Sequence, residues 1–277
     1  MIDGKTKLIA HLGYPTESFK APMIYNPYFA KKGINAVVVP MGCQLDDFQE
    51  FLKLLFRLSN IHGALITMPH KVPIVGLLDE VSVSVKVAGA CNAVRIEQNG
   101  KLVGDMFDGE GFVRGVLRKG RKVANARVLV AGNGGVGSAI AASFAKAGAA
   151  ELSLFDAFAP MMNGLAERLR ANYPHLKVTT GSNDPAGCDV VVNATPLGMK
   201  PDDPLPLDVT RIAPSTFVGE VVMKAEITPF LAAARERGCE YQVGTDMLFE
   251  QIPAYLEFFG FGTTTPEELR SVAQISY

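Results

Sequence analysis

Short apolar runs alternate with an amphipathic stretch in the first part of the chain. The runs 7–13 (KLIAHLG), 34–40 (INAVVVP) and 63–69 (GALITMP) are rich in apolar and β-branched residues and end at glycine or proline, which is typical of buried strands. Between the second and third runs, residues 45–60 place phenylalanine and leucine on one helical face, and Asp46 stands where a helix cap is expected. The order strand, helix, strand predicts a parallel α/β sheet.

Three further segments before residue 121 carry local signals of their own. Residues 21–33 (APMIYNPYFAKKG) contain two prolines, so we expect a helix there with a late or kinked start. Asn99-Gly100 stands between two short runs and predicts the turn of a β-hairpin. The segment 109–120 has a helical pattern, and the chain then enters a new unit.

From Arg127 onward, strands and helices alternate regularly. The predicted strands are 127–132, 150–156, 177–181, 189–195 and 216–222, and the predicted helices are 136–147, 160–172, 228–237 and a terminal region from Asp246. The pattern therefore predicts two α/β domains. The first comprises residues 1–104, with the C-terminal helices 245–277 returning to it, and the second comprises residues 105–244.

Composition and charge limit the class of function. A chain of 277 residues is too long for one average core, and 48% hydrophobic with 20% charged residues is typical of a soluble globular protein. The net charge of −1, without a long run of one sign, favours neither nucleic acid nor a membrane as a partner. The sequence shows no bilayer-spanning run and no signal peptide, and its cysteines and histidines are scattered. We expect a cytoplasmic protein with reduced thiols and no metal site.

A glycine-rich turn follows the predicted strand 127–132. Gly132, Gly134 and Gly137 form the pattern G-x-G-x-x-G directly after a strand and at the start of a helix, which is the context that dinucleotide binding requires. The first glycine permits the tight turn, the second admits the pyrophosphate, and the third lets the helix pack on its strand. Further candidates for binding the phosphates at this helix N-terminus are Asn133, Gly135 and Val136. An ordinary glycine turn is the alternative interpretation.

Asp156 ends the next predicted strand, 19 residues after Gly137, where about 20 are expected for the acid that binds the adenosine ribose. A carboxylate there accepts hydrogen bonds from both ribose hydroxyls and repels a 2′-phosphate. Residues 155–162 contain no arginine that could bind such a phosphate. The pattern predicts NAD rather than NADP as the cofactor, unless Asp156 only caps a helix.

Two charged residues follow predicted strands in the first domain. Lys71 comes just after the run 63–69, and Asp108 follows a short run and precedes a helix. Taken singly, each has an ordinary interpretation, as a charge at a strand end and as a helix cap. Together they supply what alcohol oxidation needs, because an amine can exchange a proton with the substrate oxygen while a carboxylate orients the amine. Their spacing alone does not show that they meet.

The order of these motifs resembles the shikimate dehydrogenase family over nearly the whole chain. The matching segments are GYPTESFKAP (13–22), GALITMPHK (63–71), AGACNAV (88–94), GDMFDGEG (104–111), VVNATPLGM (191–199) and GTDMLFEQ (244–251). The resemblance implies that Lys71 is catalytic with Asp108 as its partner, and that Thr67, Asn92 and Gln251 bind the substrate. It also implies further cofactor-binding candidates, namely Ala194, Thr195, Pro196, Val221, Gly244, Met247 and Leu248.

The chain departs from the family's pattern at the end of the site that holds the substrate carboxylate. The two serines that bind this carboxylate correspond to Phe19 and Ala21, and the tyrosine that assists them corresponds to Gly219. The asparagine that opens the family's N-V-T strand corresponds to Leu65. Each lost charged hydrogen bond costs on the order of 1.5–3 kcal/mol, so shikimate should be bound poorly.

We therefore expect an N-terminal α/β substrate domain and a Rossmann-type dinucleotide-binding domain, with the active site in the cleft between them. The expected activity is reversible hydride transfer between NAD and the secondary hydroxyl or ketone of a small cyclic hydroxy acid or polyol, in a monomer or homodimer. One alternative is an ordinary shikimate or quinate dehydrogenase whose carboxylate is bound by Lys20 or Ser18. The other is a catalytically idle NAD-binding sensor, which the retention of Lys71 and Asp108 disfavours.

Overall fold

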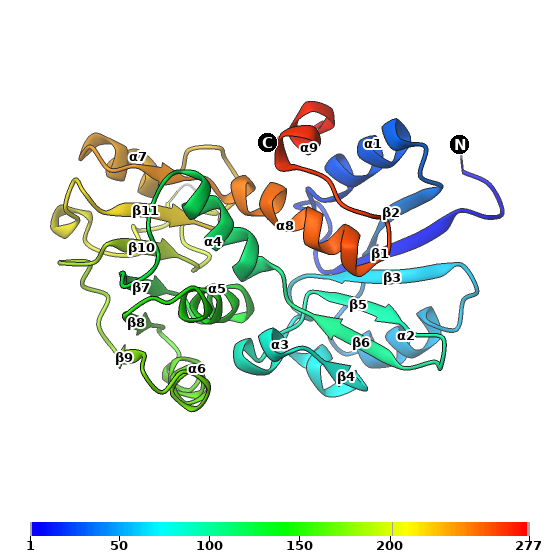
Figure 1. Ribbon diagram of the computed structural model, residues 1–277, viewed down its shortest axis with the longest axis horizontal. Helices are drawn as coiled ribbons and strands as arrows, with labels where there is room; N and C mark the ends of the chain where they lie inside the picture. The colour runs from blue at the N-terminus through cyan, green and yellow to red at the C-terminus, as the bar shows by residue number, and fades with distance from the viewer. Residues whose placement is uncertain (1, 201, 276–277) are drawn as a thin grey trace. The chain divides into compact units, whose positions relative to one another are not determined.

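The computed structural model describes residues 2–200 and 202–275, and the chain folds into two compact α/β units. Unit 1 contains the residues up to Lys86, Ala90–Phe107 and the residues from Gln251 onward, and unit 2 contains Val87–Gly89 and Asp108–Glu250. Apart from the short segment Val87–Gly89, the chain crosses between units after 107 and after 250, whereas the sequence pattern places the crossings after 104 and after 244. The helix α8 (Gly244–Phe258) begins in unit 2 and ends in unit 1 (Figure 1).

The sheet of unit 1 has the strand order β2-β1-β3-β5-β6-β4. Its strands are β1 (Lys7–Gly13), β2 (Ala36–Gly42), β3 (Ile61–Ile66), β4 (Glu80–Val81), β5 (Ala93–Ile96) and β6 (Leu102–Asp105). The first three strands are parallel, as predicted, and β1 lies between β2 and β3. The strands β5 and β6 form an antiparallel hairpin whose turn holds Gly100 at a φ of +83°, which confirms the predicted turn.

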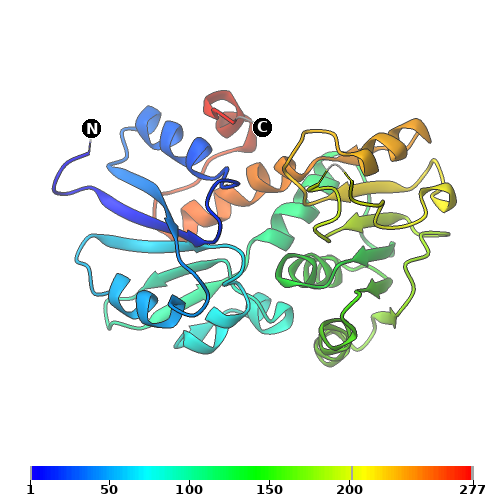
Figure 2. The same ribbon diagram turned by 180° about the vertical axis from the view of Figure 1, so that it is seen from behind.

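The helices of unit 1 differ from the prediction at their starts. They are α1 (Pro22–Lys32), α2 (Phe48–Leu55), the 3₁₀ helix η1 (Pro73–Leu77), α3 (Val83–Ala88, shared with unit 2) and α9 (Pro266–Val272). The helix α1 starts directly at Pro22, where a missing N–H costs nothing, so the predicted late start is wrong. Asp47, not Asp46, precedes α2, and its side chain makes no capping bond within the described chain. Figures 1 and 2 both show α9 beside α1, and Lys32 pairs with Glu268 at 2.6 Å there.

The sheet of unit 2 is parallel and has the order β12-β11-β10-β7-β8-β9. Its strands are β7 (Arg127–Ala131), β8 (Glu151–Phe155), β9 (Lys177–Thr180), β10 (Val190–Asn193), β11 (Phe217–Glu220) and β12 (Tyr241–Gln242). Its helices are α4 (Asp108–Arg118), α5 (Gly135–Lys146), α6 (Ala159–Asn172), α7 (Pro229–Glu236) and the 3₁₀ helix η2 (Val209–Arg211). In chain order this is the 3-2-1-4-5-6 arrangement of a Rossmann-type fold, which confirms the predicted class. The strand order reverses between β7 and β10, where such folds bind dinucleotides.

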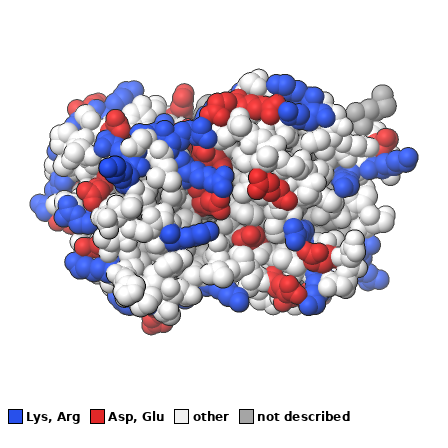
Figure 3. Space-filling model, viewed as in Figure 1, with Lys and Arg blue, Asp and Glu red and all other residues white. Residues whose placement is uncertain are grey.

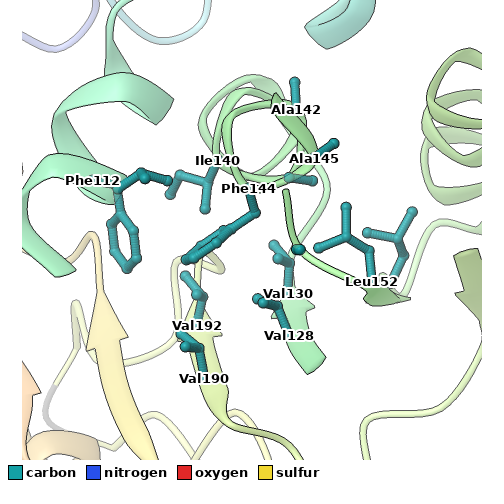
Figure 4. Packing of buried hydrophobic residues seen from close by; sticks show 14 of the residues in the cluster. Phe112, Val128, Val130, Ile140, Ala142, Phe144, Ala145, Leu152, Val190 and Val192 are labelled. Carbon is teal, nitrogen blue, oxygen red and sulfur yellow. The ribbon is translucent and has the colours of Figure 1, made fainter. Parts of the chain in front are cut away.

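Apolar side chains cover both faces of this sheet. Figure 4 shows the ring of Phe144 in α5 directed at β7 and β10, with Val192 below it. Phe112 of α4 meets Phe144 edge to face at 6.1 Å between ring centroids. The neighbouring strand position, Val191, points into a second cluster that contains Phe230 of α7. Burial on two faces fixes the strands, and with them the loops that leave their carboxyl ends.

The surface carries charges of both signs. Figure 3 shows lysine and arginine side chains interspersed with aspartate and glutamate over the face drawn there. Within the described ranges, no helix combines the length and the apolar character that a membrane span needs. The same residues contain no cluster of three or more histidine, cysteine, aspartate or glutamate side chains that could hold a metal ion.

Candidate active site

Lys71 is positioned by a turn that follows β3. The strand ends at Ile66, and His70 then donates its backbone N–H to the carbonyl of Thr67 at 2.9 Å. The His70 ring is fully buried, stacks on Phe48 at 3.9 Å between ring centroids, and shares a hydrogen bond of 2.8 Å with the carbonyl of Cys43. Burial lowers the pKa of His70, so its ring serves as a neutral anchor. The turn therefore holds Lys71 in a buried position at the carboxyl end of the sheet.

The loop after β1 is tied to this turn. Thr67 donates its backbone N–H to the carbonyl of Leu12 at 2.8 Å, and Tyr14 donates to the carbonyl of Met68 at 2.9 Å. Because β1 lies between β2 and β3, the direction of the strand order changes at its end. In open α/β sheets, ligands bind at the carboxyl ends of strands at such points. Thr67 and Lys71 lie at this edge of unit 1.

Asn92 lies beside the same turn and is fully buried. Its backbone carbonyl accepts from Ile66 N at 2.8 Å, and the preceding residue, Cys91, donates its N–H to the carbonyl of Lys71 at 2.8 Å. The side-chain oxygen of Asn92 accepts from the backbone N–H of Phe107 at 3.0 Å. Its side-chain NH₂ group has no hydrogen-bond partner among the residues described. A buried donor left in this way is typical of a position that binds a polar ligand.

Gln251 is linked to Asn92 through its own helix. It lies on α8 one turn before Tyr255, whose hydroxyl donates to the carbonyl of Asn92 at 3.3 Å. Gln251 is 5% exposed, and its side-chain oxygen has no hydrogen-bond partner in the described ranges. Residues far apart in the sequence thus present buried amide groups that are able to bind hydroxyls.

Asp108 is the first residue of α4 and begins the long segment of unit 2, and it is 3% exposed. A carboxylate at a helix N-terminus is stabilised by the free N–H groups there. The preceding residue, Phe107, is the one whose N–H Asn92 accepts. Asn92 therefore joins the segment that leads into Asp108 to the segment that carries Lys71.

The positions of the family's two serines are apolar here. A side chain on Gly13 would place its Cβ 2.8 Å from the ring of Phe19 and would also overlap the methyl of Thr67, so this ring lies close to Thr67. Ala21 is 8% exposed at the N-cap of α1. Neither side chain can donate a hydrogen bond to a carboxylate.

Gly219 is closely packed by neighbouring side chains. It is an interior position of β11, and a Cβ there would lie 2.6 Å from the ring of Phe112 and 3.1 Å from Gln242. Gly219 is therefore a packing position in the core of unit 2, with no room for a tyrosine. This packing gives no support to the predicted role of Gly219 in binding the substrate.

His11 was not singled out by the sequence pattern. It lies on β1 opposite Leu65 of β3 and stacks on Phe19 at 4.1 Å between ring centroids. The signal that could have revealed it is a histidine at an inward position of an otherwise apolar strand. Its neighbour across the sheet depends on the register of β1 and β3, which the sequence pattern does not show.

The glycines of the turn after β7 play three distinct parts. Gly132 adopts a φ of +89°, and a Cβ there would lie 2.6 Å from the backbone of Ala194. A Cβ on Gly137 would overlap the carbonyl oxygen of Gly132, so helix and strand pack too closely for a side chain. A Cβ added at Gly134 would have no atom within 4 Å among the described residues. Packing within the chain therefore does not require a glycine at this position. These are the roles expected for a turn that admits a pyrophosphate next to Gly134.

Asp156 lies against this turn. One carboxylate oxygen accepts from the backbone N–H of Asn133 at 2.5 Å, and the other accepts from Phe158 two residues on at 2.8 Å. The second bond closes a local turn before α6, whose N-cap residue is Phe158, so Asp156 precedes this helix without being its cap. The first bond places its charge beside the glycine-rich turn. Each oxygen keeps a lone pair that can accept a ribose hydroxyl.

The loop after β10 is braced by a buried polar network. Thr195 donates its hydroxyl to the side chain of Asn193 at 2.6 Å, and the NH₂ group of Asn193 donates to Glu220 at 3.4 Å. Thr228 donates to the other oxygen of Glu220 at 2.7 Å. Burial raises the pKa of the Glu220 carboxyl to about 7. This network keeps the loop of Ala194, Thr195 and Pro196 beside the glycine-rich turn.

The start of α8 completes this edge of unit 2. A Cβ on Gly244 would overlap the carbonyl of Val222 and would lie 3.0 Å from the backbone of Val221. Met247 and Leu248 are buried one turn later. The cofactor candidates of unit 2 therefore gather at the carboxyl ends of β7, β10 and β11.

Known proteins resemble this chain in sequence and in fold. Residues 12–94 match the family model described as the shikimate dehydrogenase substrate binding domain. The shikimate dehydrogenase (NADP(+)) of Rubrobacter xylanophilus is 34% identical over 254 residues, which cover 90% of this chain and 89% of the relative. A crystal structure of shikimate 5-dehydrogenase from Listeria monocytogenes in complex with shikimate and NAD superimposes with a TM-score of 0.89 at 25% identity, covering 98% of this chain and 97% of that one.

A quinate dehydrogenase from Corynebacterium glutamicum in complex with NAD gives a TM-score of 0.85 at 27% identity, covering 96% of this chain and 98% of that one. Unit 1 contains all of the matched substrate-domain segment except Val87–Gly89, and unit 2 has the Rossmann-type strand order. Identity above 30% over nine-tenths of the length, with the same succession of domains, leaves one conclusion. The chain belongs to the shikimate dehydrogenase family.

Proposed function

We propose that this chain is an NAD-preferring dehydrogenase that transfers hydride reversibly between the nicotinamide and the secondary hydroxyl or ketone of a small cyclic hydroxy acid or polyol. Membership of the family supports the general part of this proposal, that the chain is an NAD(P)-dependent oxidoreductase acting on a CH–OH group. The finer proposal rests on one contrast within unit 1. The buried amides of Asn92 and Gln251 are kept for hydroxyls, while Phe19 and Ala21 stand where a carboxylate would be bound.

In this proposal a nicotinamide dinucleotide, when bound, supplies the hydride acceptor or donor. Gly134 would admit its pyrophosphate, and Asp156 would bind its adenosine ribose. The open space at Gly134 and the lone pairs left on Asp156 fit such a group. The unpartnered buried oxygen of Asn133, in the part of the chain described, adds an acceptor at the same turn.

The acid–base step is assigned to Lys71. In the oxidative direction its amine takes the proton of the substrate hydroxyl while the hydride leaves the carbon that bears this hydroxyl. In the reductive direction its ammonium returns a proton to the oxygen of the ketone that is being reduced. Asp108 orients the amine. Asn92 and Gln251 hold neighbouring hydroxyls and thereby fix the reacting carbon.

The preference for NAD is proposed from the carboxylate of Asp156. It would stand against the 2′-phosphate of NADP, and residues 155–162 contain no arginine to offset the repulsion. The relative from Rubrobacter xylanophilus is named for NADP(+), and the Listeria and Corynebacterium structures contain NAD. The choice of cofactor therefore has to be measured.

A second candidate function is that of an ordinary shikimate or quinate dehydrogenase, which the names of the relatives favour. In that case other groups near Phe19 and Ala21 bind the carboxylate. The two functions differ in one measurable quantity, kcat/KM for shikimate. We also propose a cytoplasmic location and a monomeric or homodimeric state, the latter to be measured by light scattering.

The test is a panel of shikimate, quinate and carboxylate-free cyclic polyols with NAD and with NADP, run on wild type and on Lys71→Ala. This variant should lose roughly 10²–10⁴-fold in turnover, as expected for a lost acid–base group, with unchanged NAD affinity. Lys53→Ala, at an exposed position of α2, is the matched control and should retain full activity. If Lys71→Ala keeps more than about a tenth of the activity on the best substrate, the assignment of Lys71 is wrong.

The substrate part is tested separately with Phe19→Ser combined with Ala21→Ser. This pair should raise kcat/KM for shikimate by restoring two hydroxyl donors, each worth about 1.5–3 kcal/mol against a carboxylate. Efficient use of shikimate by the wild type would establish the second candidate function instead.

A further inference from the structure

His11 occupies a position in unit 1 that has no assigned role. It faces Leu65 across the parallel pair of β1 and β3, and side chains in register on neighbouring strands lie on the same face of a sheet. Leu65 stands where the family's pattern has an asparagine. The polar side chain of His11 on β1 therefore lies next to the position on β3 where the family's asparagine is replaced by Leu65.

The surroundings of His11 are those of the substrate site rather than of the core. Its ring stacks on Phe19 at 4.1 Å between centroids and 29° between planes, and the Phe19 ring lies beside Gly13 and Thr67. His11 is 7% exposed, and its Nδ1 is buried with no hydrogen-bond partner in residues 2–200 and 202–275. A histidine that served only to fill space would leave this nitrogen unpaired at a net cost.

The charge state of His11 bears on what it can bind. Burial, with a further contribution from the positive charge of Lys71, lowers the pKa of His11 to about 3. The ring is therefore a neutral imidazole at physiological pH, and each of its nitrogens can take part in one hydrogen bond, as donor or as acceptor. A hydroxyl or ketone oxygen suits such a partner. A carboxylate would face Phe19, Ala21 and Leu65 with no cation from His11 to compensate its desolvation.

We propose that His11 binds the substrate and determines its class, by a hydrogen bond from its imidazole to an uncharged oxygen at the end of the site where the family's pattern binds a carboxylate. The substrate class that follows is a neutral cyclic polyol, or the corresponding ketone, rather than a hydroxy acid. This inference rests on the proposed function and narrows its substrate. The Phe19 ring supplies an apolar surface for the ring face of the same molecule.

The experiment compares two substrates that differ in a single group. These are quinate and the cyclohexanetetrol that lacks only its carboxylate, each assayed with wild type, His11→Val and His11→Asn. Wild type should use the tetrol with the higher kcat/KM. His11→Val should lower this value roughly tenfold or more, mainly through KM, and His11→Asn should recover most of the loss by restoring a neutral polar group. The matched control is His175→Val at an exposed position of unit 2. This variant should leave kcat/KM unchanged for both substrates.

Stability separates this role from a structural one. His11→Val removes an unpaired buried polar atom, so its Tm should equal or exceed that of wild type. A purely structural histidine would show a lower Tm with parallel losses on both substrates, and that outcome would overturn the inference. Higher kcat/KM for quinate in wild type, or an unchanged ratio of the two substrates in His11→Val, would overturn it as well.

Direct binding keeps this test independent of turnover. Calorimetric titration of the tetrol into wild type and His11→Val should show binding that weakens by the same factor as kcat/KM. If Lys71→Ala abolishes activity while the His11 variants keep the wild-type ratio and affinity, the proposed function stands and the inference about His11 is wrong. If neither substrate is turned over but the tetrol binds in a His11-dependent manner, the catalytic proposal fails and the binding role of His11 remains.

Discussion

The side-chain oxygen of Asn92 accepts the backbone N–H of Phe107 at 3.0 Å, while its NH₂ group stays buried without a partner in the described chain. One half of this amide therefore supports the fold, and the other half is available to a ligand. The two halves can be separated by substitution, because aspartate keeps the acceptor and removes both donors.

Asn92→Asp should retain the bond to Phe107 and lose the donor to a substrate hydroxyl. We expect a rise in KM of roughly tenfold or more at saturating NAD, with a smaller fall in Tm than in Asn92→Ala. The alanine variant should lose both functions, because it also leaves the N–H of Phe107 unpaired. Asn60→Asp, at an exposed position of unit 1, is the control. Equal KM values in wild type and Asn92→Asp would remove Asn92 from the substrate site.

The glycine-rich turn allows a prediction that separates binding from folding. Gly134→Ala adds a methyl group where no described atom of the chain lies within 4 Å, so the Tm of the free protein should be unchanged. The methyl would occupy the approach of the pyrophosphate, and NAD affinity should fall by at least about tenfold. Gly76→Ala, which also points into open space, is the matched control and should leave NAD affinity unaltered. Wild-type affinity for NAD in Gly134→Ala, measured by fluorescence titration, would place the cofactor elsewhere.

Local patterns predicted the elements well because the forces that form them are local. The apolar run of β1 was predicted with the bounds that the structure has, Lys7–Gly13, and the turn at Gly100 followed from a dipeptide alone. The residue that precedes α2 was predicted wrongly by one position, because Asp46 and Asp47 are equivalent in sequence and only the incoming backbone decides between them. Helix ends are decided by such details of geometry.

The parts of the site that sequence did not reveal depend on register. The neighbours of His11 are set by the pairing of β1 with β3 and by the fold of the loop that carries Phe19. Gly219 was assigned to the substrate by motif, but only the packing of β11 shows that Phe112 occupies the space beside it. Both relations join residues far apart in the chain, and no local periodicity encodes them.

Glu220 predicts a pH dependence of stability. Its carboxyl is fully buried, and burial raises its pKa from 4.5 to about 7, so the folded chain binds a proton there that the unfolded chain has released. A raised carboxyl pKa contributes stability that is complete below pH 4.5 and is lost as the pH rises through 7. Relative to Glu220→Gln, wild type should lose roughly 3 kcal/mol of unfolding free energy across this range.

The measurement is urea unfolding of wild type and Glu220→Gln at pH 5 and at pH 8, with Glu226→Gln as an exposed control. The glutamine can keep the bond from Thr228, which supports a folded variant at both pH values. Parallel pH profiles for wild type and Glu220→Gln would show that Glu220 is ionised in the folded state.

The last prediction concerns the choice between NAD and NADP. The carboxylate of Asp156 is held beside the glycine-rich turn by the N–H of Asn133 at 2.5 Å. Its negative charge would repel the 2′-phosphate of NADP. Charged hydrogen bonds of about 1.5–3 kcal/mol to the ribose of NAD, together with this repulsion, imply a preference of roughly 10²-fold or more. Asp156→Asn keeps an acceptor for the turn and removes the charge, so most of the preference should vanish while turnover at saturating cofactor is retained.

Asp156→Ser should behave similarly with some loss of affinity for both cofactors, because the hydrogen bond that holds Asn133 is lost too. Glu167→Gln removes an exposed negative charge from α6 and should leave the ratio of kcat/KM values unchanged. Equal or better use of NADP by the wild type would show that Asp156 serves the turn alone and that other groups receive the ribose.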